Sequence, residues 1–485
     1  MTSLTFYGGV NEIGGNKILV EEGKTRFFLD FGMSFGVAGK YFDEFLQPRK
    51  CNGILDLQEF GLLPDLKGIY REDYLEHCSL KTGPRTVDGV LLSHAHMDHS
   101  AYVHFLRKDM PIYCTSASKD VMEALDQTGS GSFIELVNFK ESFKLGEAKK
   151  GGLKKLDSRH IEPVPRPIHE IDSKRFKVGD VEVEAVPVNH SLPGATAYII
   201  YADCGPIVYT GDLRFHGYGR QFTEDFVKKA AKVKPKVLII EGTRVDSNKI
   251  ESEGKVKDDC KETVERTKGL IIVNFPVRDI DRMATFLEIA KESDRSLVIN
   301  TKQAYLLQLL EESKVEAPRV DDKNIRVHLP KKTWGVLCDD RFPDEIKCQD
   351  YESWERGFLD HKNSVTYEEV GKNQGEYIFR CDFFELKNLI DIRPEKGSAY
   401  IRSVTEPFSD EMMIDARKAD EWLKHFKLYP YLQAHCSGHA NGLDLKRIVE
   451  EIGAETVIPV HTEKAGEFKE FGKVLEVECR KRYSV

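Results

Sequence analysis

The spacing of apolar residues predicts short strands through the first half of the chain. Residues 4–30 read as two strands around a glycine turn, and the apolar run over residues 87–93 is typical of a buried strand. A helix is predicted to open at Ser100. Four further strands, several of which end in a polar residue, are predicted at residues 181–190, 196–203, 206–212 and 236–243. Polar residues at strand ends indicate a site along one edge of a sheet.

Beyond about residue 245 the pattern changes to strands that alternate with helices. Residues 246–269 are charged and helix-like, 269–275 read as a strand, and 280–293 as a helix. The alternation continues to about residue 430 and predicts an α/β unit with its own parallel sheet. The last stretch returns to short elements, predicted as a strand, a helix and a strand at residues 431–438, 442–454 and 456–461. The expected division of the chain is therefore 1–244, 245–430 and 431–485.

Two segments are less regular than the rest. Residues 33–80 hold aromatic and charged side chains, and we expect an elaborated loop or a small helical insert there. Residues 139–180 are basic and interrupted by proline and glycine. The simple interpretation of this basic segment is a solvated surface loop. The functional alternative is a contact with a phosphate backbone.

Composition places the chain among globular proteins. With 485 residues, 40% of them hydrophobic and 31% charged, it can bury a full core, and its length favours two domains. It has no run of about 18 apolar residues, so no membrane span is expected. The N-terminal residues lack the features of a secretory signal, which predicts a cytoplasmic protein. Ten scattered cysteines without a Cys-x-x-Cys pair indicate reduced thiols.

The formal net charge of −9 argues mildly against a general polyanion binder, because such proteins are usually basic. It leaves room for a locally basic groove. Bound metal cations would also change the field close to a site.

The strongest chemical signal is the segment Ser93-His94-Ala95-His96-Met97-Asp98-His99, directly after a predicted buried strand. A loop there can point His94 and His96 one way, and Asp98 and His99 the other. Such an arrangement supplies ligands to two neighbouring metal ions. Imidazole and carboxylate ligands suit Zn²⁺, with Mn²⁺ as the alternative. The spacing favours this interpretation over a chance cluster of histidines.

The segment HAHMDH resembles the His-x-His-x-Asp-His motif of hydrolases with the metallo-β-lactamase fold, an α/β fold built as an αββα sandwich. The other motifs of that family follow in order, as Asp30 in FLDFG, His190 in VNHS and Asp212 in YTGD. The resemblance implies that Asp212 bridges both metals and that Asp30 braces the ligand loop. It assigns the remaining ligands to a first metal with His94, His96 and His190, and a second with Asp98 and His99.

The chain also resembles the β-CASP branch of these hydrolases, which processes nucleic acids. Glu241 and Thr243 in IIEGT are similar to its motif A, His439 in HCSGHA to motif B, and His461 in IPVHTE to motif C. The resemblance implies an inserted α/β β-CASP domain between Glu241 and His439. It also implies that His461 completes the second metal site. A histidine at motif C resembles the RNA-cutting members rather than the DNA-repair members.

Within this branch, GGVNEIGGNK and HCSGHA are similar to ribonuclease J and its relatives. Two features depart from that subfamily. Only residues 462–485 follow motif C, so the chain is expected to lack the C-terminal domain of the longer enzymes. Residues 275–282, FPVRDIDR, differ from the family's usual segment. Without the C-terminal domain the usual argument for dimerisation is missing, and a homodimer stays an open alternative.

Phosphodiester hydrolysis needs a nucleophile, charge neutralisation and a proton for the leaving oxygen. Two metal ions can supply the first two. His439 suits the proton donor, because imidazole titrates near neutral pH. The resemblance implies that Glu241 orients His439, and it assigns catalytic roles to Asp98, Glu241 and His439.

The resemblance further implies that His435, Ser437, Gly438 and His439 contact substrate. For His435 and Ser437 the alternative is ordinary hydrogen bonding at a strand end. Two pairs of residues in the inserted domain could either form surface salt bridges or bind phosphate: Arg278 with Arg282, and Arg402 with Ser403.

The leading hypothesis is a metal-dependent ribonuclease that acts on single-stranded RNA in RNA processing or decay, as a 5′-to-3′ exonuclease with endonuclease activity as an addition. One alternative is a β-CASP DNA nuclease. Another is a thioester or lactone hydrolase on the same fold, because fold does not determine function. The last is a catalytically inactive binding subunit, although every ligand position is filled.

Overall fold

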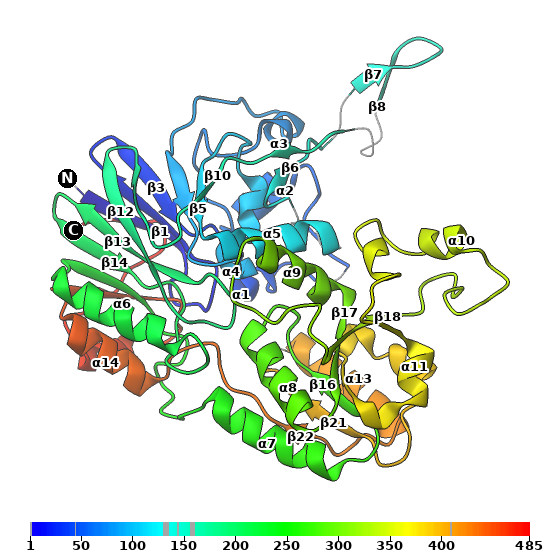
Figure 1. Cartoon of the computed structure of the whole chain (residues 1–485). Coiled ribbons are helices and arrows are strands. Elements are labelled where there is room, and N and C mark those ends of the chain that lie inside the picture. The colour runs from blue at the N-terminus through cyan, green and yellow to red at the C-terminus, as the bar shows by residue number, and fades with distance from the viewer. Residues whose placement is uncertain (1, 44, 130–134, 143–144, 156–160, 408–409) are drawn as a thin grey trace. The chain divides into compact units, whose positions relative to one another are not determined.

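The computed structural model describes residues 2–43, 45–129, 135–142, 145–155, 161–407 and 410–485. The chain folds into two compact units (Figure 1). The first unit comprises Met1–Phe215, Gly219–Ile250 and Gly438–Val485, and the second comprises His216–Tyr218 and Glu251–Ser437. The main change points at Ile250 and Ser437 come later along the chain than residues 244 and 430, where the sequence pattern placed them.

The first unit contains two large sheets. The seven-stranded sheet has the order β10-β5-β4-β3-β2-β1-β24, and the six-stranded sheet has the order β11-β12-β13-β14-β15-β23. The strands of the first are β1 Thr2–Gly8, β2 Lys17–Glu22, β3 Thr25–Leu29, β4 Gly89–Leu91, β5 Ile112–Cys114, β10 Ile168–Glu170 and β24 Arg482–Ser484. Those of the second are β11 Arg175–Val178, β12 Val181–Pro187, β13 Thr196–Ala202, β14 Gly205–Tyr209, β15 Val237–Glu241 and β23 Thr456–Val460.

Alternating side chains build two layers of core around the six-stranded sheet. In β14, Ile207 and Tyr209 pack among residues of the seven-stranded sheet, whereas Val208 packs toward α6 (Arg220–Lys232) and α14 (Gly442–Ile452). The two sheets therefore face each other across one core, and α6 and α14 cover the outer side (Figure 1). The helix α5 (Ser116–Thr128) lies on the other side of the seven-stranded sheet. This is the αββα sandwich that the sequence predicts.

Two local expectations about the first unit need correction. Residues 4–30 form three strands rather than two, because Gly23, with φ +58°, permits a tight turn between β2 and β3. The helix expected from Ser100 begins earlier, as α4 (Met97–Ser100), followed by a 3₁₀ turn at Ala101–Phe105. It begins there because the carbonyl of His96 accepts hydrogen bonds from the N–H groups of His99 and Ser100.

The irregular segments are also resolved into elements. The insert after β3 holds three short helices, α1 (Phe35–Ala38), α2 (Gly53–Glu59) and α3 (Glu72–His77), as expected. The basic segment forms short strands, including a hairpin of β7 (Leu145–Glu147) and β8 (Leu153–Lys155). The structure also pairs β6 (Asn138–Phe139) with β9 (Val164–Pro165). Residues 143–144 and 156–160 of the basic segment lie outside the described residues.

The second unit is built on a parallel seven-stranded sheet of order β19-β18-β17-β20-β16-β21-β22, which confirms the expected α/β unit. Its strands are β16 Ile271–Asn274, β17 Ser296–Asn300, β18 Ile325–Leu329, β19 Ser364–Thr366, β20 Tyr377–Arg380, β21 Ala399–Arg402 and β22 Leu432–Gln433. The strand expected at 431–438 is therefore shorter than predicted. Beyond Gln433 the chain leaves the sheet.

Helices cover both faces of this sheet (Figure 1). Their bounds are α7 Glu253–Arg266, α8 Ile280–Glu292, α9 Thr301–Glu312, α10 Asp344–Gln349, α11 Tyr367–Lys372, α12 Asn388–Ile392 and α13 Asp410–His425. One face packs Ile272, Val298 and Phe379 against residues of α11, α12 and α13, including Val370 and Leu389. No helix among the described residues has the length and apolar character that crossing a membrane requires.

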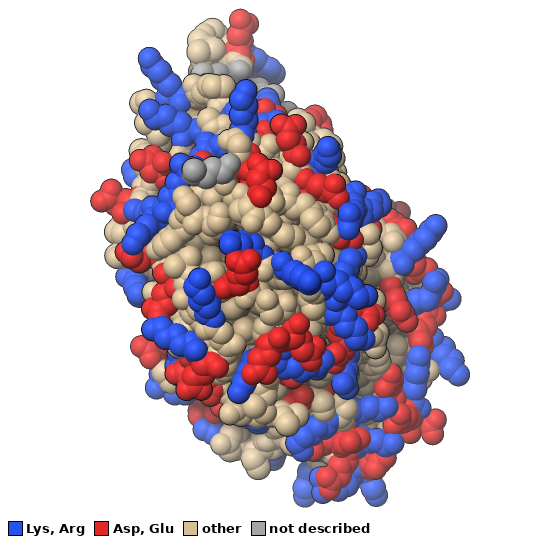
Figure 2. Space-filling model, turned by 90° about the vertical axis from the view of Figure 1, so that its left-hand side faces the viewer, with Lys and Arg blue, Asp and Glu red and all other residues tan. Residues whose placement is uncertain are grey.

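One face of the molecule carries charged side chains of both signs. On the face in Figure 2, lysine and arginine side chains intermingle with aspartate and glutamate side chains. This distribution agrees with the small negative net charge of the chain.

Candidate metal centre

The first unit gathers the predicted metal ligands at the carboxyl ends of its strands. The loop carrying His94, His96, Asp98 and His99 follows β4. His190, Asp212 and His461 follow β12, β14 and β23, all strands of the six-stranded sheet. The two facing sheets therefore contribute ligands from opposite sides of the core to one place.

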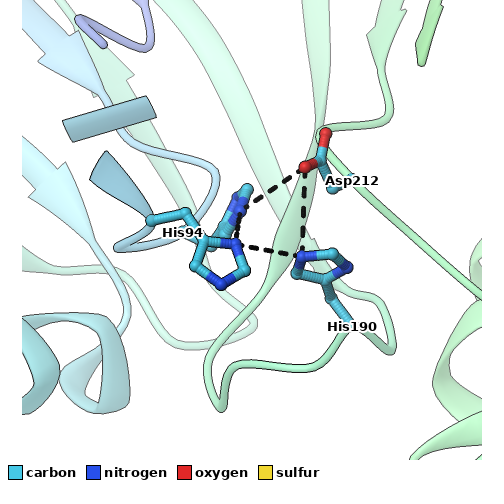
Figure 3. Close-up of side chains that lie close together, drawn as sticks. His94, His190 and Asp212 are labelled. Carbon is cyan, nitrogen blue, oxygen red and sulfur yellow. Dashed lines mark hydrogen bonds and ion pairs between the residues drawn. The ribbon is translucent and has the colours of Figure 1, made fainter. Parts of the chain in front are cut away.

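Four of these residues form the first group (Figure 3). His94 Nε2 lies 2.9 Å from His96 Nδ1, which lies 3.1 Å from His190 Nε2. Oδ2 of Asp212 lies 3.6 Å from His94 Nε2 and 3.9 Å from His190 Nε2. Three imidazole nitrogens and one carboxylate oxygen thus converge on one small volume.

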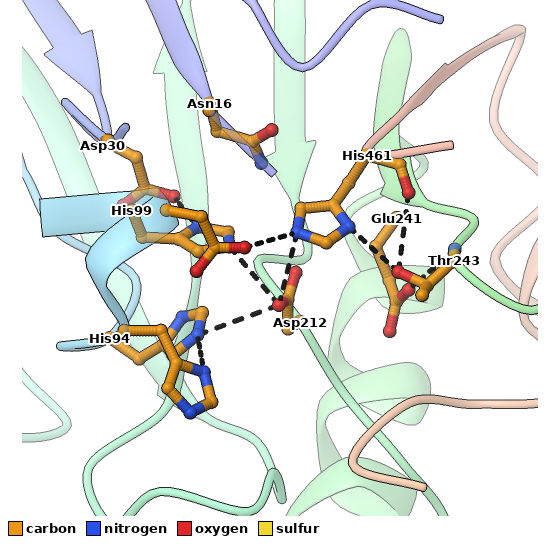
Figure 4. Close-up of polar contacts among 12 residues, drawn as sticks. Asn16, Asp30, His94, His99, Asp212, Glu241, Thr243 and His461 are labelled. Atoms are coloured by element: carbon orange, nitrogen blue, oxygen red, sulfur yellow. Dashed lines mark hydrogen bonds and ion pairs between the residues drawn. The ribbon is translucent and has the colours of Figure 1, made fainter. Parts of the chain in front are cut away.

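The same Asp212 oxygen faces the second group (Figure 4). It lies 3.2 Å from His99 Nε2 and 3.6 Å from His461 Nε2. Asp98 Oδ2 lies 3.1 Å from His461 Nε2 and 3.8 Å from His99 Nε2. Oδ2 of Asp212 is therefore shared between the two groups, as a bridging carboxylate would be.

The donor set fits two divalent cations. Among the described residues, both carboxylate oxygens of Asp212 and Nε2 of His99 are buried without a hydrogen bond. Such groups are costly unless something satisfies them. Burial lowers the pKa of His94 well below its usual range, and the nearby His99 lowers it further. Burial likewise lowers the pKa of His190, helped by His96. Neutral imidazoles with converging nitrogens, and a shared carboxylate, are ligands that suit Zn²⁺ or a similar ion.

The outer nitrogens of the ligand histidines are held in place. Nδ1 of His99 lies 2.7 Å from Oδ2 of Asp30, and Nδ1 of His461 lies 2.8 Å from Oγ1 of Thr243. Nδ1 of His190 lies 2.5 Å from the carbonyl oxygen of Gly438. Contacts of this kind determine ring orientation and tautomer in metal sites.

The glycine-rich loop of residues 8–17 supports the second group, a role that its sequence alone did not indicate. The N–H of Asn16 donates to the carbonyl of Asp98 at 3.1 Å, and the N–H of His461 donates to the carbonyl of Gly9 at 2.7 Å. A Cβ on Gly14 would lie 2.7 Å from both Cβ and Oδ2 of Asp98. The repeated glycines were the sequence signal that could have indicated this close packing, since Gly14 adopts φ +80°, which favours glycine. The loop thus contacts both Asp98 and His461, two of the predicted ligands.

Lys17 anchors this loop from within the core. Its Nζ donates to the carbonyls of Gly15 at 2.8 Å and Gly32 at 2.9 Å, and the side chain is fully buried. Desolvation lowers the pKa of Lys17 to about 8, although Glu12 opposes the shift. Both of these hydrogen bonds of Lys17 Nζ go to backbone carbonyl groups. No sequence motif predicts a buried lysine of this kind.

Glu241 and His439 meet beside the metal ligands. Nδ1 of His439 lies 3.1 Å from Oε1 of Glu241 and 3.9 Å from Oδ2 of Asp212. Burial alone would lower the pKa of His439, but the charges of Glu241 and Asp212 outweigh it and raise the pKa to about 9. Glu241 is itself buried and accepts the N–H groups of Leu213 and Thr243. The two carboxylates favour the protonated form of His439 next to the candidate metal centre.

Comparisons with known proteins show which sequences and folds this chain is similar to. The model of the family described as "Beta-lactamase superfamily domain" matches residues 64–270. Ribonuclease J of Pyrococcus abyssi is 25% identical over 309 residues, which cover 61% of this chain and 58% of that protein. Ribonuclease J of Mycobacterium tuberculosis is 24% identical over 294 residues, which cover 59% of this chain and 42% of that protein. The chain thus matches about half the length of these relatives.

The chain has the metallo-β-lactamase fold and is similar in sequence to ribonuclease J. A solved structure of a protein of unknown function from Enterococcus faecalis V583 supports the fold, with a TM-score of 0.74, 24% identity and coverage of 99% of both chains.

Several predicted substrate-binding residues belong to the second unit, whereas the predicted metal ligands belong to the first. The N–H of Ser437 donates to Oε2 of Glu251 at 3.1 Å. Burial, together with the charge of Arg282, lowers the pKa of His435 to about 4. Arg278 is half-buried, and among the described residues it has no hydrogen bond or ion pair.

The expectation that Arg282 is an exposed helix residue is wrong. Its side chain is fully buried, where Nε and Nη2 bind the two carboxylate oxygens of Glu253 at 2.9 and 3.0 Å. Arg282 also donates to the carbonyl of Ser403, which is buried too. Arg402 donates to Gln433 and to the carbonyl of Thr405. Arg282 therefore stabilises the interior of the second unit and is not a surface phosphate contact.

Proposed function

We propose that this chain is a metal-dependent ribonuclease that hydrolyses phosphodiester bonds in single-stranded RNA. The observation that carries the proposal is the contact between His439 and Glu241 beside a two-metal ligand set. Hydrolysis of a phosphodiester requires a proton donor for the leaving oxygen, and this pair supplies one. The ribonuclease J names of the two relatives support RNA as the substrate class.

We propose that the two groups bind zinc, with manganese as the alternative. Metal ions bound there would activate a nucleophile and neutralise charge on the scissile phosphate. The residues have separate tasks. Oδ2 of Asp212 is shared between the two groups, whereas Oδ2 of Asp98 contacts the second group through His461. Glu241 binds Nδ1 of His439, so His439 would give its proton to the leaving oxygen from Nε2. Asp30 keeps His99 oriented through its Nδ1 atom.

We further propose that the second unit is a β-CASP domain that binds the RNA. Arg278 supports this assignment, since it is a half-buried cation without a protein partner among the described residues. A phosphate group would satisfy its five donors. His435, Ser437 and Gly438 follow the second unit's last strand toward His439, and we assign them to substrate contacts. The proposed activity is 5′-to-3′ exonucleolytic with additional endonucleolytic cleavage, in cytoplasmic RNA processing or decay.

The test uses protein loaded with Zn²⁺ or Mn²⁺ and four substrates, namely 5′-monophosphate RNA, 5′-triphosphate RNA, circular RNA and single-stranded DNA of matched sequence. We expect degradation of linear RNA from the 5′ end and slower cutting of the circle. Cleavage of DNA in preference to RNA would move the assignment to a DNA nuclease. A metal-loaded protein that degrades none of the four substrates would overturn the proposal, and thioester and lactone substrates would then be tried.

A further inference from the structure

The metal centre opens to solvent along one stretch of its ligand loop. His94 and His99 are completely buried, whereas His96, Met97 and Asp98 between them are partly exposed. The Asp98 side chain is 19% exposed. A substrate phosphate that reaches the second group therefore has access next to Asp98.

Two other segments of the first unit border this opening. Gly14 packs directly against the Asp98 side chain, and the N–H of Met33 donates to the carbonyl of Met97 at 3.0 Å. Each segment also carries an apolar side chain that stays outside the core. Ile13 precedes Gly14, and Phe35 follows Met33 by two residues. Ile13 is 45% exposed and Phe35 is 52% exposed.

The backbone that carries these side chains is held in place. Oγ of Ser34 accepts the N–H of Val37 as the cap of α1 and donates to the carboxylate of Glu12. A Cβ on Gly15 would lie 2.8 Å from Cβ of Ser34, so the two segments are in close contact. Residues 12–15 and 33–35 thus form one packed edge. Two residues of extended chain span about 7 Å, so Phe35 stays near Met33 and the ligand loop.

Single exposed apolar residues are common and need no explanation. Here two of them are carried by segments that contact each other and that both contact the predicted ligand loop, through Gly14 and Met33. Polar side chains would serve solubility better at this place. The chain also offers little general attraction for a polyanion, because its net charge is −9 and the charges in Figure 2 are mixed. Contacts with the bases would add affinity that general charge attraction does not supply.

We propose that Phe35 and Ile13, carried by these two contacting segments, form an apolar surface on which a base of the RNA stacks next to the scissile phosphate. The inference rests on the proposed ribonuclease function. Base stacking on an aromatic ring is independent of sequence, because every base has a π-face. The surface would set the position of the nucleotide while the metal ligands and His439 act on its phosphate.

The experiment compares Phe35→Ala with the unchanged protein on two substrates. One is a single-stranded oligoribonucleotide with a single cleavage site, and the other is the same oligomer with abasic nucleotides on both sides of that site. Phe35→Ala should raise KM for the first substrate about tenfold, with kcat within about twofold, because stacking contributes to binding. On the abasic oligomer its KM should equal that of the unchanged protein.

Three further variants make the result specific. Phe35→Trp should restore KM, and its added fluorescence should be quenched by a non-cleavable oligomer. Ile13→Ala should give a smaller rise in KM on the first substrate. Trp334→Ala removes a 57%-exposed ring from the second unit and should leave KM unchanged. Metal content and circular dichroism of each variant report on folding.

The stacking proposal is overturned if Phe35→Ala leaves KM for the intact oligomer unchanged. It is also overturned if the rise in KM is equal on the abasic oligomer, since the ring would then act without a base. A normally loaded parent protein that cleaves no RNA overturns the proposed function and the stacking together. Cleavage by the parent protein with an unaffected Phe35→Ala variant overturns the stacking alone.

Discussion

Nδ1 of His439 lies 3.1 Å from Oε1 of Glu241, and the two residues approach each other from β15 and from the segment before α14. This contact separates the roles of the residues around the metal centre. Asp212 contacts histidines of both metal groups. His439 instead contacts Glu241, which we do not assign as a ligand of either metal. The distinction leads to the first prediction.

His439→Ala should retain metal and lose activity, because it removes the proton donor and leaves the ligand histidines in place. We expect kcat on RNA to fall by about 10²- to 10⁴-fold, the range for loss of a general acid. Asp212→Ala should lose both metal and activity. Metal content by elemental analysis and single-turnover cleavage would check both variants. Equal metal loss in the two proteins would show that His439 acts as a ligand.

Asp30→Ala should weaken metal binding without removing a ligand. Its carboxylate accepts hydrogen bonds from the N–H and the hydroxyl of Ser93, at 2.7 and 2.8 Å, and contacts Nδ1 of His99. Loss of such support typically lowers metal affinity by about 10- to 100-fold. Titration of metal-free protein followed by calorimetry measures the effect. Asp172→Ala is the control, since Asp172 accepts the N–H and Oγ of Ser116 instead of supporting the ligand loop. An unaltered affinity in Asp30→Ala would contradict the bracing role.

Gly14→Ala should disturb the second metal group selectively. The new Cβ would lie 2.7 Å from Oδ2 of Asp98, and φ of +80° disfavours any residue with a side chain. Gly23→Ala is the matched control, because Gly23 also has positive φ, at +58°, yet a Cβ there meets nothing within 4 Å. Both variants should lose about 1 kcal/mol of stability from backbone strain. Only Gly14→Ala should bind fewer than two metal ions per chain, and a full complement of metal would refute the prediction.

The buried Lys17 should make stability depend on pH in the alkaline range. Its pKa is about 8 in the folded protein against a model value of 10.5, so the unfolded chain holds the proton more tightly. Stability therefore increases as pH rises from about 8 toward 10.5, and the group contributes nothing further above that range. Each unit of pKa difference corresponds to about 1.4 kcal/mol. We expect about 2 kcal/mol more stability at pH 10 than at pH 8 from this residue.

Urea unfolding at pH 8 and pH 10 measures this difference, with Lys17→Met as the reference. Other groups titrate in the same range, and they do so in both proteins. The quantity of interest is therefore the difference between the two pH dependences. Identical slopes for the parent protein and Lys17→Met would show that Lys17 titrates normally.

The sequence by itself determined the features that depend on local order. The ligands His94, His96, Asp98 and His99 lie within six residues, so their proximity follows from the chain itself. The parallel unit follows from alternating strands and helices, since parallel strands need long connections. Polar residues at the ends of predicted strands also indicated the edge that carries the site. Family resemblance added the distant residues Asp212, Glu241, His439 and His461.

Only the tertiary structure decided which distant groups touch. Arg282 looked like an exposed helix residue because a helical pattern does not reveal its partner, and Glu253 lies 29 positions away in sequence. The support of Asp98 by Gly14 and Asn16, and the burial of Lys17 over the carbonyls of Gly15 and Gly32, depend on how a glycine loop packs against another loop. Such contacts follow from side-chain volume and backbone geometry in three dimensions. The sequence therefore predicts the ligand loop, whereas the contacts that orient it depend on how the folded chain packs.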